Sequence, residues 1–261
     1  MRLELYTWQP NANSGKPLLC LKEKGVEFVY HYVDIGKLEQ HSPDYLRLNP
    51  DGTVPTLVHA GHVLTESTAA MEYIDAVFEG PPLRPRDPYA LWRMRRWCRY
   101  MDLYLCPALA MIGSQRAAAT FKERDRRELE RALESIPLPE RRRTWSMVMF
   151  DCIPTHELEE SNRRVLAAIE MYEAALAKEP YLAGNEYSLA DISSMATLYA
   201  LPLARPEQVN EAMTPHLIAW LRRCHARPAI QAAFALGNDW ITGRVREVRR
   251  LLGIEAQRGA G

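Results

Sequence analysis

Ser14 is the first residue whose position suggests chemistry. It lies in residues 13–17, Asn-Ser-Gly-Lys-Pro, which follow a short strand-like stretch and open a helical pattern. The N-terminus of a helix presents free N–H groups and a partial positive charge, so it stabilises an anion, and a serine hydroxyl can donate a hydrogen bond to the same anion. The alternative is that Ser14 or Asn13 only caps the helix.

Two further features follow at intervals along the first 80 residues. Residues 49–55 read Asn-Pro-Asp-Gly-Thr-Val-Pro, and a cis bond before Pro55 would turn the Val54 N–H and C=O outward, where an extended peptide could pair with them. A trans proline that starts a strand is the alternative, since only about 5–6% of X–Pro bonds in folded proteins are cis. Glu66 and Ser67 precede another helix. The carboxylate suits an amine, and the helix start suits a carboxylate, although Ser67 could simply be the N-cap.

One hydroxyl and one helix suffice to ionise a thiol near neutral pH. A thiol of pKa about 8.5 is only about 3% thiolate at pH 7, and lowering its pKa to about 6.5 requires ~2.7 kcal/mol. A hydrogen bond to a charged acceptor supplies about 1.5–3 kcal/mol, and a helix N-terminus adds ~0.3–1 kcal/mol. Ser14 would therefore act as a donor, and nothing in the sequence resembles a Ser-His-Asp arrangement.

Strands and helices are expected to alternate over the first 80 residues, and these elements must position the candidate residues. Gly25 predicts the end of a helix, and Ala60-Gly61 predicts a hairpin turn. The order β-α-β-α-β-β-α predicts a parallel crossover followed by an antiparallel hairpin in one sheet. Strands are expected over residues 2–7, 27–33, 56–59 and 62–64, and helices over residues 14–24, 37–48 and from 67 to just before Gly80.

The rest of the chain is predicted to be helical. Residues 81–88 carry four prolines and indicate a linker, so the expected organisation is an α/β domain at residues 1–80 and an all-α domain at residues 89–261. Ser188 and Asp191 form a start that resembles a capping box. The charged run at residues 122–143 indicates a solvated helical insertion, with a lid over a pocket as the alternative. Helices are expected over residues 89–119, 122–135, 156–178, 189–201, 215–226 and 228–252.

Composition excludes several classes of protein. The chain has 33 basic and 33 acidic residues, which argues against charge-driven binding to nucleic acid or an anionic membrane. It lacks a signal-peptide pattern and any apolar run approaching 18 residues, so a cytoplasmic protein is expected. The five scattered cysteines include no C-x-x-C pair, which gives no support for a disulfide framework, a redox dithiol or a metal site.

Together these motifs resemble the cytosolic glutathione transferases over nearly the whole chain. The first part carries LxLY, NSxKP, EKG, NPxGxVPxL and TES, and the second carries YLAGNEYSLADI. More narrowly, PNANSGKPL, LEQHS, NPDGTVPTLVHAG and LRPRDP are similar to the LigF-type β-etherases, which are bacterial glutathione-dependent enzymes that cut aryl ethers in lignin-derived dimers. The resemblance implies a thioredoxin-like N-terminal domain, an all-helical C-terminal domain, glutathione as co-substrate and a homodimer.

The resemblance also implies which residues contact glutathione. Ser14, together with Asn13, is implied to contact the sulfur. Tyr6 is the rival donor, with core packing as its other interpretation, and Cys20 is expected to be buried. Val54, beside Pro55, is implied to pair with the cysteinyl backbone. Glu66 and Ser67 are implied to hold the γ-glutamyl end, and Gln40 and His41 the glycyl end. A solvated helix face is the alternative for His41.

Aromatic residues supply a possible acceptor pocket. Trp97, Tyr100, Met101 and Tyr104 fall on one face of a helix, which predicts mainly core. In the family that this chain resembles, the same helix borders the acceptor site. The side chains expected to stack on an aryl substrate are Trp8, Tyr100, Tyr104 and Trp145.

The reaction that the resemblance implies is cleavage of a β-aryl ether whose α-carbon is a ketone. The thiolate attacks the β-carbon, a glutathione thioether forms, and a phenol leaves with inversion at that carbon. The sequence leaves two alternatives open, which are a general conjugating or isomerising transferase and a non-enzymatic transferase-like binding module.

Overall fold

A four-stranded mixed sheet forms the N-terminal part of the protein. The computed structural model describes residues 2–254, so the last part of the predicted helical domain, residues 255–261, lies outside the described residues. The strand order is β2-β1-β3-β4, with β1 parallel to β2 and antiparallel to β3, and with β3 antiparallel to β4. The expected crossover and hairpin are confirmed. The strands are β1 Leu3–Thr7, β2 Val29–Tyr32, β3 Thr56–His59 and β4 His62–Leu64.

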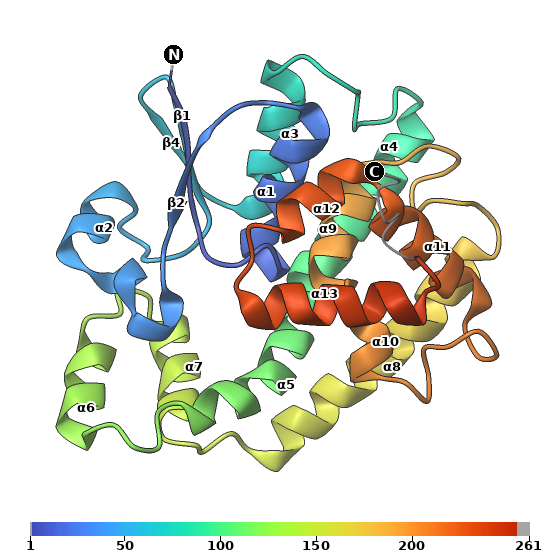
Figure 1. The fold of residues 1–261 in the computed structure, drawn as a ribbon. Helices are drawn as coiled ribbons and strands as arrows, with labels where there is room; N and C mark the ends of the chain where they lie inside the picture. The colour runs from blue at the N-terminus through green and yellow to red at the C-terminus, as the bar shows by residue number, and fades with distance from the viewer. Residues whose placement is uncertain (1, 255–261) are drawn as a thin grey trace, which may run out of the picture.

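Helices cover both faces of this sheet. In Figure 1, α1 and α3 lie on one side of the strands and α2 lies on the other. Alternation along β1 explains the division, because Leu3, Leu5 and Thr7 are buried while Glu4 and Tyr6 are half-buried. The helices are α1 Ala12–Lys24, α2 Pro43–Leu48 and α3 Ser67–Val77, and two single-turn 3-10 helices, η1 Ile35–Lys37 and η2 Glu39–His41, precede α2.

The helix predicted over residues 37–48 is wrong as a continuous element. Leu38 adopts a left-handed backbone conformation with φ of 61° and separates η1 from η2. Ser42 then caps a new helix whose first residue is Pro43. Each break interrupts the helical hydrogen-bond ladder, so the segment folds as three short turns.

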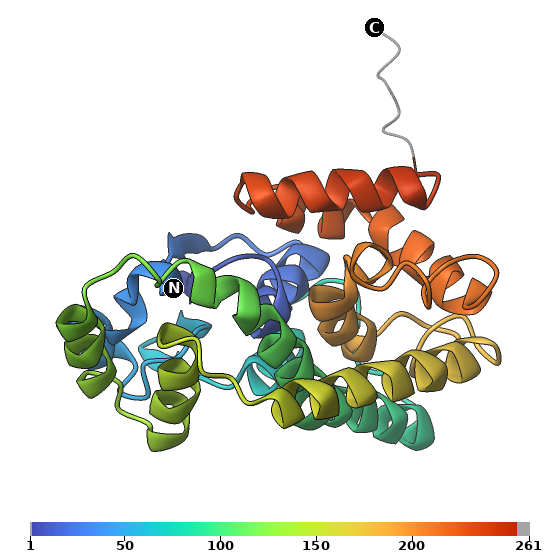
Figure 2. The same ribbon diagram turned by 90° about the horizontal axis from the view of Figure 1, so that it is seen from below.

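The C-terminal part is helical, as expected (Figures 1 and 2), but its long helices are broken differently from the prediction. The single helix expected over residues 89–119 contains a π-helical turn, η3 Met101–Leu105, and the helix expected over 228–252 is two helices. Ser188 and Asp191 form the predicted capping box. Helices α7 and α10 were not predicted. The elements are α4 Pro88–Tyr100, α5 Cys106–Ala119, α6 Arg126–Glu134, α7 Pro139–Met149, α8 Thr155–Leu176, α9 Leu189–Leu198, α10 Leu201–Ala204, α11 Pro215–Ala226, α12 Pro228–Phe234 and α13 Asp239–Leu251.

Two apolar clusters hold these elements together. The larger one is continuous from the sheet into the helical part and includes Leu5, Cys20, Met71 and Trp220. Cys20 is fully buried, as predicted. A second, separate group, which we call the insertion cluster, has as its buried members Leu38, Ala118, Phe121, Leu129, Val148 and Met149. Among the described helices, none is both long enough and apolar enough to cross a membrane.

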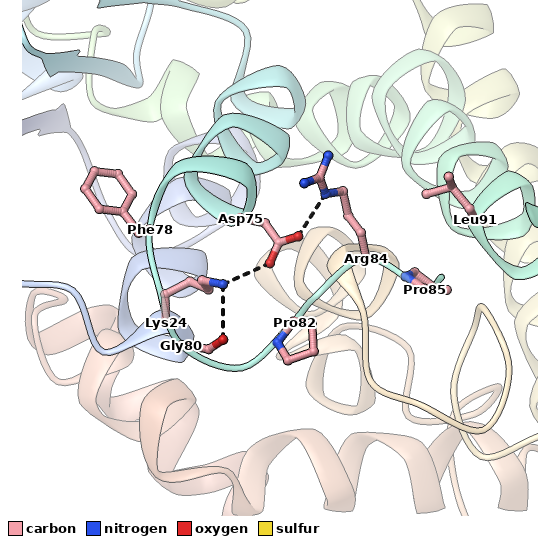
Figure 3. A pocket seen from close by; sticks show the side chains of 8 residues that line it. All are labelled: Lys24, Asp75, Phe78, Gly80, Pro82, Arg84, Pro85 and Leu91. Carbon is pink, nitrogen blue, oxygen red and sulfur yellow. Dashed lines mark hydrogen bonds and ion pairs between the residues drawn. The ribbon is translucent and has the colours of Figure 1, made fainter. Parts of the chain in front are cut away.

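A buried ion network joins α1, α3 and the linker. Asp75 accepts hydrogen bonds from the Lys24 ammonium at 3.1 Å and from Arg84 Nε at 2.8 Å (Figure 3), and from the Leu83 backbone N–H at 2.9 Å. Burial alone would raise the pKa of Asp75, but the hydrogen bonds from Arg84, Leu83 and Lys24 outweigh it and hold the pKa below its usual value. The network borders a cavity of about 440 Å³ (Figure 3). Because its charged side chains engage one another, we assign this cavity to the junction of the two parts.

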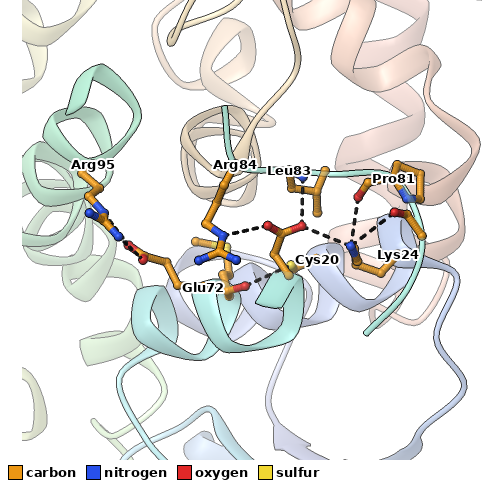
Figure 4. A network of polar contacts seen from close by, with 10 residues as sticks. Cys20, Lys24, Glu72, Pro81, Leu83, Arg84 and Arg95 are labelled. Carbon is orange, nitrogen blue, oxygen red and sulfur yellow. Dashed lines mark hydrogen bonds and ion pairs between the residues drawn. The ribbon is translucent and has the colours of Figure 1, made fainter. Parts of the chain in front are cut away.

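We predict that Asp75→Ala lowers the free energy of unfolding by about 3–5 kcal/mol, because it leaves the buried Lys24 ammonium without a carboxylate. Glu72 is the matched control, since its ion pair with Arg95 is on the exposed side of the same helix (Figure 4). Glu72→Ala should cost less than about 1 kcal/mol. Urea denaturation at pH 7 measures both values, and equal losses would contradict the assignment.

Candidate active site

The N-terminus of α1 is open. Asn11 occupies the N-cap position with extended backbone angles, but its side chain makes no capping hydrogen bond. Ser14 lies in the first turn and is buried, and its carbonyl accepts a hydrogen bond from Thr7 Oγ1 at 2.9 Å. Gly15 lets the preceding loop pack onto this turn, because an added Cβ would lie 2.6 Å from the carbonyl carbon of Pro10. The first-turn N–H groups therefore remain free of a side-chain cap and can receive an anion.

The N-terminus of α3 is open in the same way. Glu66 occupies its N-cap position with φ of 60° and forms no side-chain capping bond. Ser67, the first helical residue, is buried, whereas Glu66 is exposed. This pair therefore offers an accessible carboxylate beside an uncapped helix start.

A buried lysine brings these two helix starts together. Lys16, two residues after Ser14, has no solvent exposure and forms an ion pair with Asp102 of η3. The same Asp102 carboxylate accepts a hydrogen bond from Thr68 Oγ1, in the first turn of α3, at 3.1 Å. One carboxylate thus connects the first turns of α1 and α3, so that Ser14 and Ser67 border the same region.

The loop that carries Val54 has a cis bond before Pro55. Asn49 is buried and holds this loop, donating to the Thr53 carbonyl at 2.9 Å and to Thr56 Oγ1 at 3.0 Å. The Val54 N–H and C=O form no backbone hydrogen bond within residues 2–254. Since Thr56 pairs with Tyr6 in the sheet, the loop lies beside the end of β1, where the chain turns toward Ser14.

Gln40 and His41 lie in η2 and are both buried, at 3% and 6% exposure. Two of their polar atoms, Gln40 Oε1 and His41 Nδ1, have no hydrogen-bond partner among the described residues. Burial and then the Arg141 guanidinium lower the pKa of His41 to about 4, against a smaller opposing effect of the Gly52 backbone. His41 is therefore neutral at pH 7.

Tyr6 lies on the other side of the sheet from the start of α1. Its ring stacks on His31 with 4.1 Å between the ring centroids, and its hydroxyl donates to Glu4 Oε2 at 3.2 Å. Burial and the Glu4 carboxylate raise the pKa of Tyr6 above its usual value, so its hydroxyl is a weaker acid. The geometry thus separates Tyr6 from the open helix start.

Of the four predicted pocket aromatics, the structure places only Trp8 next to the start of α1, half-buried in the preceding loop. Tyr100 packs edge-on against Trp97 and stacks on the exposed Tyr104, with 5.7 Å between the ring centroids of the two tyrosines. Trp145, in contrast, packs edge-on against Phe121, beside the insertion cluster. Trp97 and Met101, on the same helix face as Tyr100, are core residues.

Asn13 and Cys106 meet where α5 begins. Asn13 is exposed, and its Oδ1 accepts a contact from Cys106 Sγ at 3.7 Å. Burial raises the pKa of the Cys106 thiol. This contact places Asn13 against the helical part of the protein, next to Ser14.

Sequence reasoning missed several residues of this site. The sequence could have indicated that Lys16 is buried and paired, because a lysine within the apolar run KPLLCL requires a charged partner. Nothing in the sequence indicated that this partner is Asp102. Gln9 was missed too. It bridges the sheet and α13, donating to Tyr32 at 2.9 Å and accepting from the Asn238 N–H at 2.8 Å. Both contacts depend on segments far apart in the chain.

The arrangement suits a small anionic peptide that carries a nucleophile. Two uncapped helix starts provide positions for anions, and the Val54 loop provides free backbone groups for pairing. Glu66 provides a carboxylate for an amine. Ser14 lies in the first turn of α1, and the half-buried Trp8 lies in the loop before this helix start.

Comparison with known proteins shows the family of this chain. A model of the glutathione S-transferase N-terminal domain matches residues 1–76, and a model of the C-terminal domain matches residues 147–228. Protein LigF from Sphingobium sp. strain SYK-6 is 41% identical over 243 residues, which cover 90% of this chain and 93% of that protein. The chain belongs to the glutathione S-transferase family. Glutathione S-transferase 3 of Zea mays is 31% identical over 237 residues, covering 89% of this transferase and 93% of the maize protein.

Solved structures agree with the expected fold class. The crystal structure of the β-etherase LigF from Sphingobium sp. strain SYK-6 superposes on this transferase with a TM-score of 0.86 at 39% identity, covering 90% of this chain and 99% of that one. Glutathione transferase F7 from Populus trichocarpa, at 24% identity and a TM-score of 0.69, shares the fold. The thioredoxin-like domain followed by a helical domain is confirmed.

We predict that the His41 imidazole stays neutral until the pH falls to about 4. An unfolded chain would protonate this histidine near pH 6.5, so the stability it contributes above that pH is lost as the pH falls from 6.5 toward 4. Histidine ring NMR over this range measures the midpoint, with His41→Gln to assign the resonance. A midpoint near 6.5 would show that the side chain is accessible and charged.

Proposed function

We propose that this transferase cleaves β-aryl ethers of lignin-derived dimers with glutathione as co-substrate. The observation that carries the proposal is the pair of uncapped helix starts at Ser14 and Ser67, joined through Asp102, with free Val54 backbone between them. That arrangement matches the extended shape and the charges of glutathione. The similarity to the β-etherase LigF over 90% of the chain supports the choice of acceptor.

Each predicted contact has a chemical reason in this geometry. The Ser14 hydroxyl and the α1 start stabilise the glutathione thiolate, with the exposed Asn13 amide as the neighbouring donor. Val54, next to Pro55, pairs with the cysteinyl backbone. The γ-glutamyl end offers both an ammonium and a carboxylate, which suit the Glu66 carboxylate and the Ser67 helix start respectively.

The glycyl end is assigned to Gln40 and His41. Because His41 is neutral at pH 7, this pair offers hydrogen bonds and no charge. Unpartnered polar atoms at both residues support the assignment of a polar ligand to this part of the loop.

In the proposed reaction, polar contacts from the protein ionise and position the glutathione thiol. The glutathione sulfur attacks the β-carbon, a C–S bond forms, and the C–O bond to the departing phenolate breaks with inversion. The neighbouring ketone makes that carbon receptive, and a phenolate is a tolerable leaving group. The chain contributes ionisation of the thiol and alignment of sulfur and carbon at about 3–3.5 Å, with Trp8, Tyr100 and Tyr104 proposed to hold the aryl rings.

The proposal extends to the oligomeric state, the source and the cellular location of the protein. We infer a homodimer, for which the exposed stacked pair Tyr89 and Trp92 on α4, with centroids 5.5 Å apart, offers an apolar contact surface. The relative in Sphingobium supports a bacterial source. The balanced charge of the chain argues against charge-driven binding to nucleic acid or an anionic membrane. The scattered cysteines, which include no C-x-x-C pair, fit a cytoplasmic location.

We predict that Ser14→Ala raises the pKa of bound glutathione by about 1–2 units, because the thiolate loses a hydrogen bond of about 1.5–3 kcal/mol. Thiolate absorbance of the complex, followed against pH, measures the shift. Tyr6→Phe is the control and should leave the pKa unchanged, since Tyr6 bonds to Glu4 on the other side of the sheet. A shift caused by Asn13→Ala or Tyr6→Phe and not by Ser14→Ala would transfer the role.

We further predict release of guaiacol from a β-guaiacyl ketone dimer incubated with the protein and glutathione. Chromatography should detect guaiacol and the glutathione thioether in equal amounts. Each enantiomer is tested separately, because inversion at the β-carbon fixes the product configuration. Conjugation of a generic aromatic electrophile without guaiacol from either enantiomer would favour a general transferase, and absence of glutathione binding at millimolar concentration would favour a binding module.

A further inference from the structure

The loop before Gln40 and His41 is anchored outside the N-terminal part of the protein. Leu38 is only 8% exposed and belongs to the insertion cluster, whose other buried residues come from α5–α7 and the turn after α5. Its φ of 61° is rare for a residue with a Cβ and strains the backbone. Burial of the leucine side chain in the insertion cluster offsets this strain. The conformation of the loop therefore depends on the insertion.

This anchor acts directly on the two residues assigned to the glycyl end. The Leu38 carbonyl accepts the His41 backbone N–H at 2.9 Å and closes η2. The His41 ring in turn packs on Gly52, where an added Cβ would lie 2.7 Å from Cδ2. Figures 1 and 2 both show α6 and α7 beside the blue segment that contains η1, η2 and α2.

The insertion also carries a cation, Arg141, on the helix that packs against the loop of Gln40 and His41. Arg141 in α7 is exposed and forms no ion pair within the described residues, whereas Arg143 of the same helix approaches Glu157 at 3.9 Å. Arg141 lies on α7, whose Val148 and Met149 pack in the insertion cluster with Leu38, three residues before His41. In agreement with this packing, the Arg141 charge contributes to lowering the pKa of the His41 imidazole. Lys37, the nearest lysine in sequence, is already paired with Asp34. A carboxylate at Gln40 and His41 would thus meet one unpaired cation, supplied by α7.

We propose that the α6–α7 insertion is part of the glutathione site: Leu38 fixes the loop that carries Gln40 and His41, and Arg141 binds the glycyl carboxylate. This inference rests on the proposed function, since it deepens the assignment of the glycyl end. It gives the charged insertion a binding role, in place of a solvated run or a lid. The segment between the two matched family domains, residues 77–146, contains Arg141.

Calorimetry with two ligands tests the role of Arg141. Glutathione and its glycyl monoethyl ester differ only at the glycyl end, where the ester carries an ethyl group and lacks the negative charge. Arg141→Ala should raise the Kd for glutathione about two- to fivefold, as expected for an accessible ion pair, and should leave the Kd for the ester unchanged. Arg143→Ala is the matched control and should change neither. An equal change for both ligands, or none, overturns the role of Arg141.

Steady-state kinetics test the anchor. Leu38→Ala should raise the KM for glutathione and leave the KM for the aryl ether unchanged, while Leu38→Met, which keeps the apolar contact, should restore most of the affinity. Leu166→Ala, an exposed leucine of α8, is the control. Equal changes in both KM values overturn the anchor. If the wild-type protein bound no glutathione, the proposed function itself would fail, which these comparisons distinguish from failure of the inference.

Discussion

Lys16 carries a charge with no exposure to solvent, and its ion pair with Asp102 is the contact on which the site depends. Removing an ammonium from water costs several kcal/mol, so a carboxylate must accompany it. That carboxylate comes from the π-helical turn η3 and is shared with Thr68. One ion pair, together with the Thr68 hydrogen bond to the same carboxylate, therefore fixes the starts of α1 and α3 relative to each other.

Local signals were enough to predict most of the fold. Gly25 takes a left-handed conformation after α1, and both Ala60 and Gly61 have positive φ in the hairpin turn. Each of these depends on neighbouring residues alone. The break at Leu38 could not be predicted, because its left-handed backbone depends on contact with helices much later in the chain. The same holds for the π-helical turn, whose Asp102 pairs with a lysine of α1.

The residues of the candidate site also fall into two groups, those that a local sequence motif reveals and those that only the fold brings together. Ser14, Val54 and Ser67 stand in short contiguous motifs, so the sequence alone could group them. Asp102 and Arg141 belong to no motif. Only the folded chain brings Asp102 to Lys16 and Thr68, and packs α7, which carries Arg141, against Leu38. Trp145 shows the opposite error, since its chemistry suited an aryl pocket but its neighbours are the residues of the insertion. The type of a residue indicates which role its side chain could have, but the packing of the folded chain determines whether that side chain lies at the site.

Burial of the cysteines has a consequence for chemical selectivity. Cys20, Cys98, Cys106 and Cys224 are buried, and desolvation raises the pKa of each thiol. Protonated thiols are poor nucleophiles. An electrophile that enters beside Asn13 would meet Cys106 as an unreactive thiol and glutathione as a thiolate. Burial thereby protects these four thiols from alkylation, whereas Cys152 is exposed.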